Sequence, residues 1–390
     1  MLITNCKIVT MENDIIENGY IEIEGEKIKA LGNMDSLDAS RLETKAQLID
    51  AKGLTAYPGF IDPHCHMGMW EEGLDFEGDD GNEITDPVSP QLRAIDAINP
   101  NNLSFEEAYK NGITTVVTGP GSANVICGQF LAMKTYGQRV DDMVIKAPVS
   151  MKFAFGENPK NCYNDKEEAP MTRMATASLI REALEKAKRY KDQKDKAKID
   201  ADLDTPEFDA KLEALCPLFD KTLKAHIHAH RRDDIFTAIR IMKEFGIAYS
   251  IVHCTEGYLV ADILKKENIE AITGPIISSR SKPELRLASA ENPAILSQEG
   301  VSVSISTDYP EVPIQYLPLC AGIACKNGLP FEKALEAITI EAARHCNIDE
   351  RVGSLKSGKD ADIVFFDKNP LSIEASPNIV IVNGEIVNII

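Results

Sequence analysis

The sequence predicts an α/β protein, a (β/α)8 TIM barrel with a small β-sandwich domain built from both termini. Three observations predict it. Short strand patterns occur at both ends of the chain, apolar runs alternate with amphipathic helical patterns between them, and histidines stand at the ends of several of those runs. A chain of 390 residues is long enough for one barrel-sized core and a smaller module.

The sequence at both ends of the chain predicts short strands separated by tight turns. The N-terminal strand patterns cover residues 2–9, 19–24 and 27–31, and the C-terminal ones cover 362–367 and 379–387, the latter around a turn at Asn383-Gly384. Chain ends often lie close together in a folded protein. We therefore expect residues 1–57 plus 351–390 to form one β-sandwich domain.

The middle of the chain, 58–350, carries eight candidate strands: 60–64, 114–118, 130–134, 149–155, 223–228, 249–253, 271–274 and 301–307. Helical patterns lie between them, for example 104–111, 235–245 with Gly246 as its stop signal, and 331–344. Eight strands alternating with helices are typical of a (β/α)8 barrel, whose active-site residues sit at the C-terminal ends of the strands. This segment is the expected catalytic, metal-binding domain.

Residues 185–222 interrupt the alternation. They include the charged run 186–198, rich in lysine. The simplest interpretation is an exposed helical insertion, and a lid over the active site is the alternative.

Composition restricts the partners. The net charge of −19 argues against nucleic acid or an anionic membrane surface, so we expect a small-molecule substrate. The N-terminal residues lack the features of a secretory signal, and no run is apolar enough to cross a bilayer, which indicates a cytoplasmic protein. Nine scattered cysteines fit free thiols in a reducing compartment. A homo-oligomer assembled through the barrel helices is compatible with the sequence.

The clearest candidate site begins at His64 and His66. Residues i and i+2 of a strand share a face, so both imidazoles can hold one metal ion. A pair of structural histidines is the alternative for this motif alone. The chain has seven histidines, however, and six stand at the ends of apolar strand-like runs. We take a catalytic metal centre as the working hypothesis.

Other strands add polar residues to the inner face of the predicted barrel. Asp308 continues the serine face of the strand at 301–307, and Lys152 shares the face of small residues in its strand. A buried lysine is costly unless its amine is paired or neutralised. Lys152 therefore either pairs with a carboxylate such as Glu157 or serves as a carbamate that bridges metal ions.

The motif at 58–66, Pro-Gly-Phe-Ile-Asp-Pro-His-Cys-His, resembles the opening motif of the amidohydrolase superfamily, metal-dependent hydrolases built on a (β/α)8 barrel. The segment 352–367 is similar to the superfamily's return into its β-sandwich. The stretch 151–156 is similar to the lysine strand of the imidazolonepropionase and prolidase-like branch. With the remaining polar residues in the same order, the resemblance covers nearly the whole chain.

The resemblance implies a ligand set for two divalent metal ions, with zinc favoured by the ligand types: His64, His66, Lys152, His228, His253 and Asp308. Carbamylated Lys152 would bridge the ions, and Glu157 is the alternative bridging ligand. Among the three histidines at 226, 228 and 230, the one at 228 matches the superfamily's ligand position. His230 would lie one step further out, where it could touch substrate. Arg280 follows the seventh predicted strand and could pair with a substrate carboxylate, and solvated surface charge is the alternative for it.

The function implied is hydrolysis of an amide or cyclic amide C–N bond by a metal-bound hydroxide, with Asp308 as general base and then general acid. A deaminase of the same superfamily is an alternative. Deaminase-type relatives carry a glutamate three residues after the ligand histidine, where this chain has Arg231, which disfavours that alternative. The other alternative is a non-catalytic scaffold of the same fold.

Overall fold

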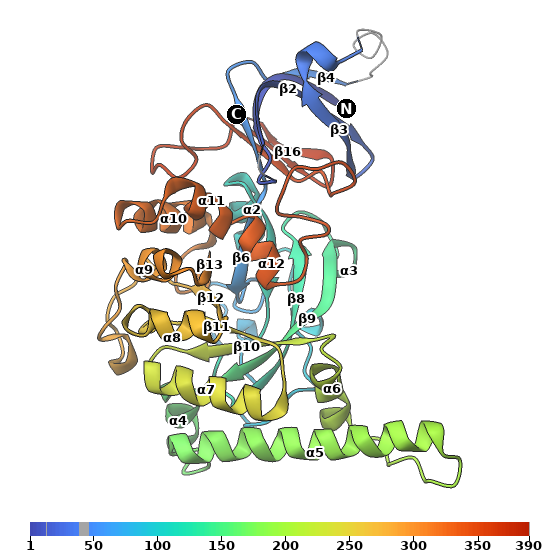
Figure 1. Cartoon of the computed structure of the whole chain (residues 1–390), viewed down its shortest axis with the longest axis vertical. Coiled ribbons are helices and arrows are strands. Elements are labelled where there is room, and N and C mark those ends of the chain that lie inside the picture. The colour runs from blue at the N-terminus through green and yellow to red at the C-terminus, as the bar shows by residue number, and fades with distance from the viewer. Residues whose placement is uncertain (13, 39–46, 390) are drawn as a thin grey trace.

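The computed structural model describes residues 1–12, 14–38 and 47–389. Two sheets organise the molecule (Figure 1). A small one carries both chain termini, and a larger one is surrounded by helices on its outer side.

The small sheet takes strands from both ends of the chain. Its order is β16-β15-β14-β5-β1-β2-β3, with β4 beside β1. The strands are β1 (Leu2–Val9), β2 (Ile15–Glu24), β3 (Lys27–Asn33), β4 (Leu48–Asp50), β5 (Thr55–Pro58), β14 (Ile363–Phe366), β15 (Ile379–Val382) and β16 (Glu385–Ile389). Because β5 pairs with β14, the N-terminal and C-terminal segments share one ladder.

The large sheet contains all eight strands expected in the middle of the chain, in the order β13-β12-β11-β10-β9-β8-β7-β6. They are β6 (Phe60–Cys65), β7 (Ile113–Thr118), β8 (Ile126–Lys134), β9 (Val144–Ala154), β10 (Lys224–Ala229), β11 (Tyr249–His253), β12 (Glu270–Thr273) and β13 (Ser302–Ile305). The central strands are buried along most of their length, as expected for strands covered on both faces.

The expectation of eight parallel strands is wrong at the third one. Strand β8 runs antiparallel to both β7 and β9, while the remaining pairs are parallel. Only residues 119–125 connect β7 to β8, and only 135–143 connect β8 to β9. A parallel crossover needs a dozen or more residues, so connections of these lengths produce hairpins.

The first and last strands of the large sheet meet. The amide of Asp308 donates to the carbonyl of His64 (3.3 Å), and the amide of His66 donates to the carbonyl of Tyr309 (2.9 Å). The Asp62 carboxylate accepts bonds from the backbone amide and the hydroxyl of Thr307. These bonds bring the segment after β13 against β6 and so place two polar strand ends together.

Helices cover the outer side of the large sheet (Figure 1). They are α2 (Leu103–Lys110), α3 (Val140–Met143), α4 (Glu157–Asn164), α5 (Arg173–Ile199), α6 (Ala210–Phe219), α7 (Arg232–Phe245), α8 (Ala261–Lys266), α9 (Asn292–Glu299), α10 (Leu317–Lys326), α11 (Phe331–Ala337) and α12 (Ile340–His345). As predicted, α7 ends at Gly246, which adopts a left-handed conformation (φ 68°).

The single helix predicted over 331–344 is divided into α11 and α12. The break falls at Ile338 and Thr339, and the Ile338 carbonyl accepts a hydrogen bond from the Ile61 amide of β6 (2.8 Å). A carbonyl inside a continuous helix would be occupied by its own i+4 amide. The interruption therefore frees a carbonyl for the sheet.

The charged run 186–198 lies in the long helix α5, which projects past the rest of the molecule (Figure 1). Its apolar side packs against α6 and α7, with Ile180, Leu184 and Leu215 in the shared core. No described residue of 185–222 lines the main pocket. The lid interpretation therefore receives no support from the pocket lining.

Buried ion pairs connect the two sheets. Lys134 at the end of β8 is buried against Asp360 (2.9 Å) and Asp362, which precede β14. Lys27 of β3 (2.5 Å) and Arg351 (2.8 Å) also pair with Asp360. The junction between the sheets is thus an extended, largely buried charge network.

All nine cysteines are free thiols, as predicted. Among the described residues, no helix has both the length and the apolar character required to span a membrane.

Candidate metal centre

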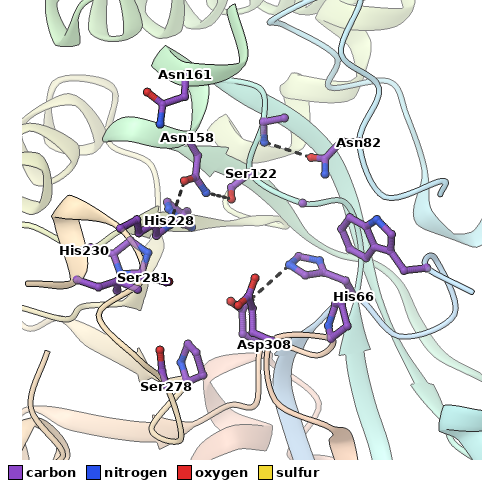
Figure 2. Close-up of a pocket in the computed structure, with 18 residues that line it drawn as sticks. His66, Asn82, Ser122, Asn158, Asn161, His228, His230, Ser278, Ser281 and Asp308 are labelled. Carbon is purple, nitrogen blue, oxygen red and sulfur yellow. Dashed lines mark hydrogen bonds and ion pairs between the residues drawn. The ribbon is translucent and has the colours of Figure 1, made fainter. Parts of the chain in front are cut away.

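A pocket of about 580 Å³ opens where the strands of the large sheet end. His66 after β6, His228 and His230 at the end of β10, and Asp308 after β13 line it (Figure 2). The polar side chains therefore arrive from several different strands at one point.

One part of the site consists of His64, His66 and Asp308. Oδ1 of Asp308 lies 3.4 Å from Nε2 of His66 and 3.7 Å from Nε2 of His64. These distances exceed normal hydrogen bonds. Two ligands of one tetrahedral zinc ion, with bonds of 2.0 to 2.2 Å, stand about 3.3 to 3.5 Å apart. The spacing is therefore that of atoms arranged around a shared ion.

A backbone contact orients the ring of His66. Its Nδ1 lies 2.7 Å from the Gly119 carbonyl, which leaves Nε2 directed toward Asp308 (Figure 2). Such a backbone contact to the second ring nitrogen fixes the tautomer of a metal-binding histidine. Trp70 packs edge-on against the same ring, with centroids 5.1 Å apart.

Lys152 lies deeper, on β9. Its Nζ is 2.8 Å from Nε2 of His64, and the side chain is fully buried. Phe130 stacks on His64, with centroids 5.0 Å apart, and the Lys152 amine lies 5.4 Å from the same Phe130 ring. Burial lowers the pKa of Lys152 to about 8. The lowered pKa increases the share of the neutral amine at neutral pH.

A second part of the site consists of His228, His230 and His253. Nδ1 of His230 lies 2.7 Å from the Thr255 hydroxyl, and Nδ1 of His253 lies 2.8 Å from the Gly274 carbonyl. Both contacts leave Nε2 of the ring free to bind a metal ion. The three rings are in contact, with centroids 4.4 to 4.6 Å apart.

Glu284, in a short turn at Pro283–Leu285, approaches this second group. Its side chain is fully buried, and Oε1 forms an ion pair with Nζ of Lys282 at 2.9 Å. Burial raises the pKa of Glu284, but the His230 ring and the Lys282 ammonium outweigh it, so the pKa lies below its ordinary value. The carboxylate is therefore anionic at neutral pH.

Burial also keeps the imidazoles neutral. It lowers the pKa of His64, His228 and His230 well below the ordinary value, and that of His253 to about 4. For Asp308, burial raises the pKa, but the His253 and His66 rings and the Lys152 amine outweigh it, and the net pKa is lowered. Neutral imidazoles and an ionised carboxylate are the forms that bind metal ions.

The backbone is strained where the ligands stand. His253, Cys254 and Asp308 all have positive φ angles, of 69°, 47° and 56°. Non-glycine residues rarely adopt this conformation, and such strain concentrates at functional sites. Here Asp308, after β13, lines the main pocket, and His253, at the end of β11, lines the neighbouring one.

The residues present fit a metal ion. Among the described residues, two groups of three ligand atoms lie within 4.8 Å of one another: His228, His230 and His253, and His64, His253 and Asp308. Several buried nitrogens of these rings, including both of His228 and Nε2 of His230, have no hydrogen-bond partner within the described part of the chain. Buried polar atoms are normally satisfied. Metal coordination would satisfy those that face the pocket.

Comparison with known families agrees with this chemistry. The model of the amidohydrolase family matches residues 55–390. The chain belongs to the amidohydrolase family.

Relatives with curated names include the amidohydrolase tasK of Hapsidospora irregularis, 28% identical over 94% of this chain and 39% of that protein. This amidohydrolase thus spans well under half the length of tasK. An imidazolonepropionase of Caldanaerobacter subterraneus subsp. tengcongensis is 28% identical over 90% of this chain and 84% of its own length. Deaminases occur among the relatives as well.

A solved structure is closely similar. The crystal structure of an amidohydrolase from Thermotoga maritima MSB8 is 34% identical, covers 99% of both chains, and superimposes with a TM-score of 0.94. The arrangement of both sheets is therefore shared with another family member.

The structure of the amidohydrolase places the six predicted ligands, His64, His66, Lys152, His228, His253 and Asp308, around one end of the large sheet. His230 joins the imidazole group of His228 and His253. The two remaining candidates lie elsewhere. Arg280 lines a neighbouring pocket of about 460 Å³ and donates to the Ala288 carbonyl (3.0 Å). Glu157 accepts a bond from the Glu284 amide (3.3 Å).

Sequence reasoning missed Glu284 as a residue of the site. It stands in an irregular loop after β12, so no strand alternation assigns it to the inner face. It also missed the pocket amides of Asn82 and Asn158 and the indole of Trp70. Trp70 and Asn82 come from loops, and Asn158 lies in the first turn of α4, so no strand periodicity marks them. Only the tertiary structure brings these side chains together.

Proposed function

We propose that this amidohydrolase is a metal-dependent hydrolase that cleaves an amide or cyclic amide C–N bond of a small polar substrate. One observation carries the proposal. Asp308, a partly exposed carboxylate at the pocket, stands within 3.7 Å of two ligand histidines, and a buried lysine contacts one of them. A reactive group next to a ligand cluster at a pocket is the arrangement that metal-assisted hydrolysis needs.

Two divalent ions, zinc before other metals, fit the donor set. His64, His66 and Asp308 would hold the first ion, and His228 and His253 the second. Lys152, as a carbamate, would bridge them, with Glu157 as the alternative that sequence analysis left open. When bound, such ions lower the pKa of water to about 7 and polarise a carbonyl group.

Asp308 supplies the proton transfers in this proposal. Its lowered pKa keeps the carboxylate ionised at neutral pH, so it can accept a proton from the attacking water. The same carboxyl group then donates that proton to the leaving nitrogen. Because the backbone at Asp308 is fixed in a left-handed conformation between Thr307 and Tyr309, both of which bond to β6 or its neighbours, the carboxylate keeps its position.

The pocket lining supports a small polar substrate. Side-chain amides of Asn82, Asn158 and Asn161 line it (Figure 2), and Trp70 and Leu285 add apolar surface. Arg280 lies in the adjoining pocket, which His253 also lines. A substrate carboxylate extending into that pocket would pair with its guanidinium.

The deaminase alternative is weaker. Arg231, at the position where deaminase-type relatives carry a glutamate, forms an exposed bidentate pair with Asp233. A non-catalytic scaffold would not need unpaired ligand nitrogens in a buried pocket.

The fold is part of the proposal. We propose that the large sheet is a (β/α)8 TIM barrel with its third strand reversed, over 58–350 with the insertion at 185–222. Residues 1–57 plus 351–390 would form the small β-sandwich domain. Bonds between the two edge strands of the large sheet and a common core under strands from both chain ends support this division.

The test combines metal analysis with a substrate panel. The full chain is expected to bind about two zinc ions and to hydrolyse members of a panel of N-acyl amino acids, dipeptides and lactams. Release of ammonia from amino-heterocycles, without hydrolysis of the panel, would favour the deaminase. A chain that binds no metal would exclude both enzymes and favour the scaffold.

A further inference from the structure

Glu284 has an environment that the proposed ligand set leaves unexplained. Its carboxylate is fully buried, and Oε1 lies 3.6 Å from Nε2 of His228 and 3.5 Å from Nε2 of His230. Sequence analysis gave Glu284 no role.

The two distances exclude hydrogen bonds and fit a shared ion. Hydrogen bonds from N–H to O are about 2.7 to 3.2 Å long. Nitrogen and oxygen ligands of one tetrahedral zinc ion stand about 3.3 to 3.5 Å apart. Among the described residues, neither Nε2 of His228 nor Nε2 of His230 has a hydrogen-bond partner. Both nitrogens are therefore available to one ion, and Oε1 of Glu284 is available to it once its ion pair with Lys282 opens.

Lys282 is the counter-ion of Oε1 in this structure. Its ammonium lies 2.9 Å from that oxygen. Lys282 also donates to Oδ1 of Asn158 (3.0 Å), and its side chain is 28% exposed at the pocket. A metal ion bound at Oε1 would replace this positive charge, and the partial exposure of Lys282 at the pocket leaves its ammonium room to move away.

The Glu284 carboxylate is fixed in place. Oε2 accepts a hydrogen bond from the Glu157 amide (3.1 Å), and the Glu284 amide donates to Glu157 in return (3.3 Å). Gly156 makes room for this contact, because a Cβ atom there would lie 2.6 Å from Oε2. A carboxylate oriented by backbone bonds is prepared to act as a ligand.

We propose that Glu284 is a metal ligand and binds the same ion as His228, His230 and His253. This inference rests on the metal centre of the proposed function and changes its second site: His230 becomes a ligand instead of a substrate contact, and a carboxylate completes the shell. Three imidazoles and one carboxylate form a four-coordinate donor set that zinc accepts. The carboxylate also supplies negative charge that three neutral imidazoles lack.

The test uses cobalt(II) as the probe, titrated into the metal-depleted full chain and followed by visible absorption and by equilibrium dialysis. Three variants are compared. Glu284→Gln removes the proposed ligand charge. Glu311→Gln is the matched control, because it removes a carboxylate of the same pocket from an exposed position. Lys282→Met removes the competing ammonium.

The wild type and Glu311→Gln are expected to bind two ions per chain. Glu284→Gln should weaken one of the two binding steps by at least about tenfold and change the cobalt absorption of that step. Lys282→Met should leave that step unchanged or tighten it. If Glu284 served only as the counter-ion of Lys282, Glu284→Gln would bind cobalt as the wild type does, which would overturn the inference.

The test can still be decided if one of the variants does not fold. Should Glu284→Gln fail to fold, Lys282→Met still decides, because a loss of cobalt affinity in that variant contradicts the proposal. A wild type that binds no cobalt would refute the proposed function itself. Failure of the inference and failure of the function are therefore distinguishable.

Discussion

Nζ of Lys152 and Nε2 of His64 lie 2.8 Å apart, although β7 and β8 separate their strands in the large sheet. The contact therefore joins two strands that are not neighbours in the large sheet. It places an amine whose pKa is lowered to about 8 directly against a ligand imidazole. At neutral pH, a larger share of this amine is unprotonated than of an ordinary lysine.

Lys152 is predicted to carry a carbamate in the metal-loaded protein. Protein reconstituted with zinc and ¹³C-bicarbonate should show a carbamate carbon signal in NMR spectra, because the neutral amine reacts with carbon dioxide. Lys152→Met should lose the signal and bind metal at least about tenfold more weakly. Lys282→Met, which removes another lysine of the pocket, should keep the signal. A labelled signal that persists in Lys152→Met would contradict the assignment.

Asp308→Asn is predicted to abolish hydrolysis while most of the metal stays bound. The amide cannot accept the proton of the attacking water, and general acid–base catalysis contributes at least about 100-fold to rates. Turnover of the best panel substrate and metal content should be measured on the same sample. Full activity with full metal content would refute the role of Asp308.

Trp70 is predicted to report metal binding, because it is the only tryptophan of the chain and its ring lies 5.1 Å from that of His66. Cobalt(II) loading should quench its emission, and a chelator should restore it. His66→Ala should reduce the quenching, since the first ion loses a ligand. If dialysis shows that cobalt is bound but the Trp70 emission does not change, the ion lies away from His66.

Asp360 is predicted to make the free energy of unfolding decrease at acidic pH. Burial raises its pKa, but Lys134, Lys27 and Arg351 outweigh it and lower the pKa to about 2, from 3.8 in an ordinary carboxyl. Between these values the unfolded chain binds a proton that the folded one does not. The stabilisation is therefore present above about pH 4 and is lost as the pH falls toward 2.

Asp360→Asn should flatten this acid dependence in denaturant unfolding and lower stability at pH 7 by about 3 kcal/mol, because Lys134 stays buried with one partner fewer. The exposed Asp367→Asn is the matched control and should change neither quantity. An unchanged slope between pH 2 and 4 in Asp360→Asn would show that this carboxyl does not carry the effect.

Much of the fold could be predicted from the sequence because its strands are regular. Alternation along the predicted strands shows which side chains share a face and assigns His64, His66 and Asp308 to inner faces. The resemblance to the amidohydrolase superfamily then implies that these residues meet. The reversed β8 could also have been inferred from its short connections. The break between α11 and α12 could not, because it depends on a hydrogen bond from Ile61 of a distant strand.

The residues of the site also differ in how well the sequence predicts their positions. Residues at strand ends have a position set by local periodicity, whereas Glu284 has one set by the bonds of its loop to Glu157. For Arg280 the sequence predicts a position after β12, and the conformation of its loop places it in the neighbouring pocket that His253 also lines. Loop conformation depends on tertiary contacts that one sequence does not display.

The hairpins of β8 have a consequence for the order of folding. Strands β7, β8 and β9 close over short connections, so their pairing costs little loop entropy and can form early. The seam between Asp62 and Thr307 joins residues 245 positions apart and is expected to form last. Asp308 follows directly after that seam, so the ligand positions are complete only when the sheet has closed. A bound ion would hold that late seam shut, and the chain would acquire its rigidity and its chemistry in the same step.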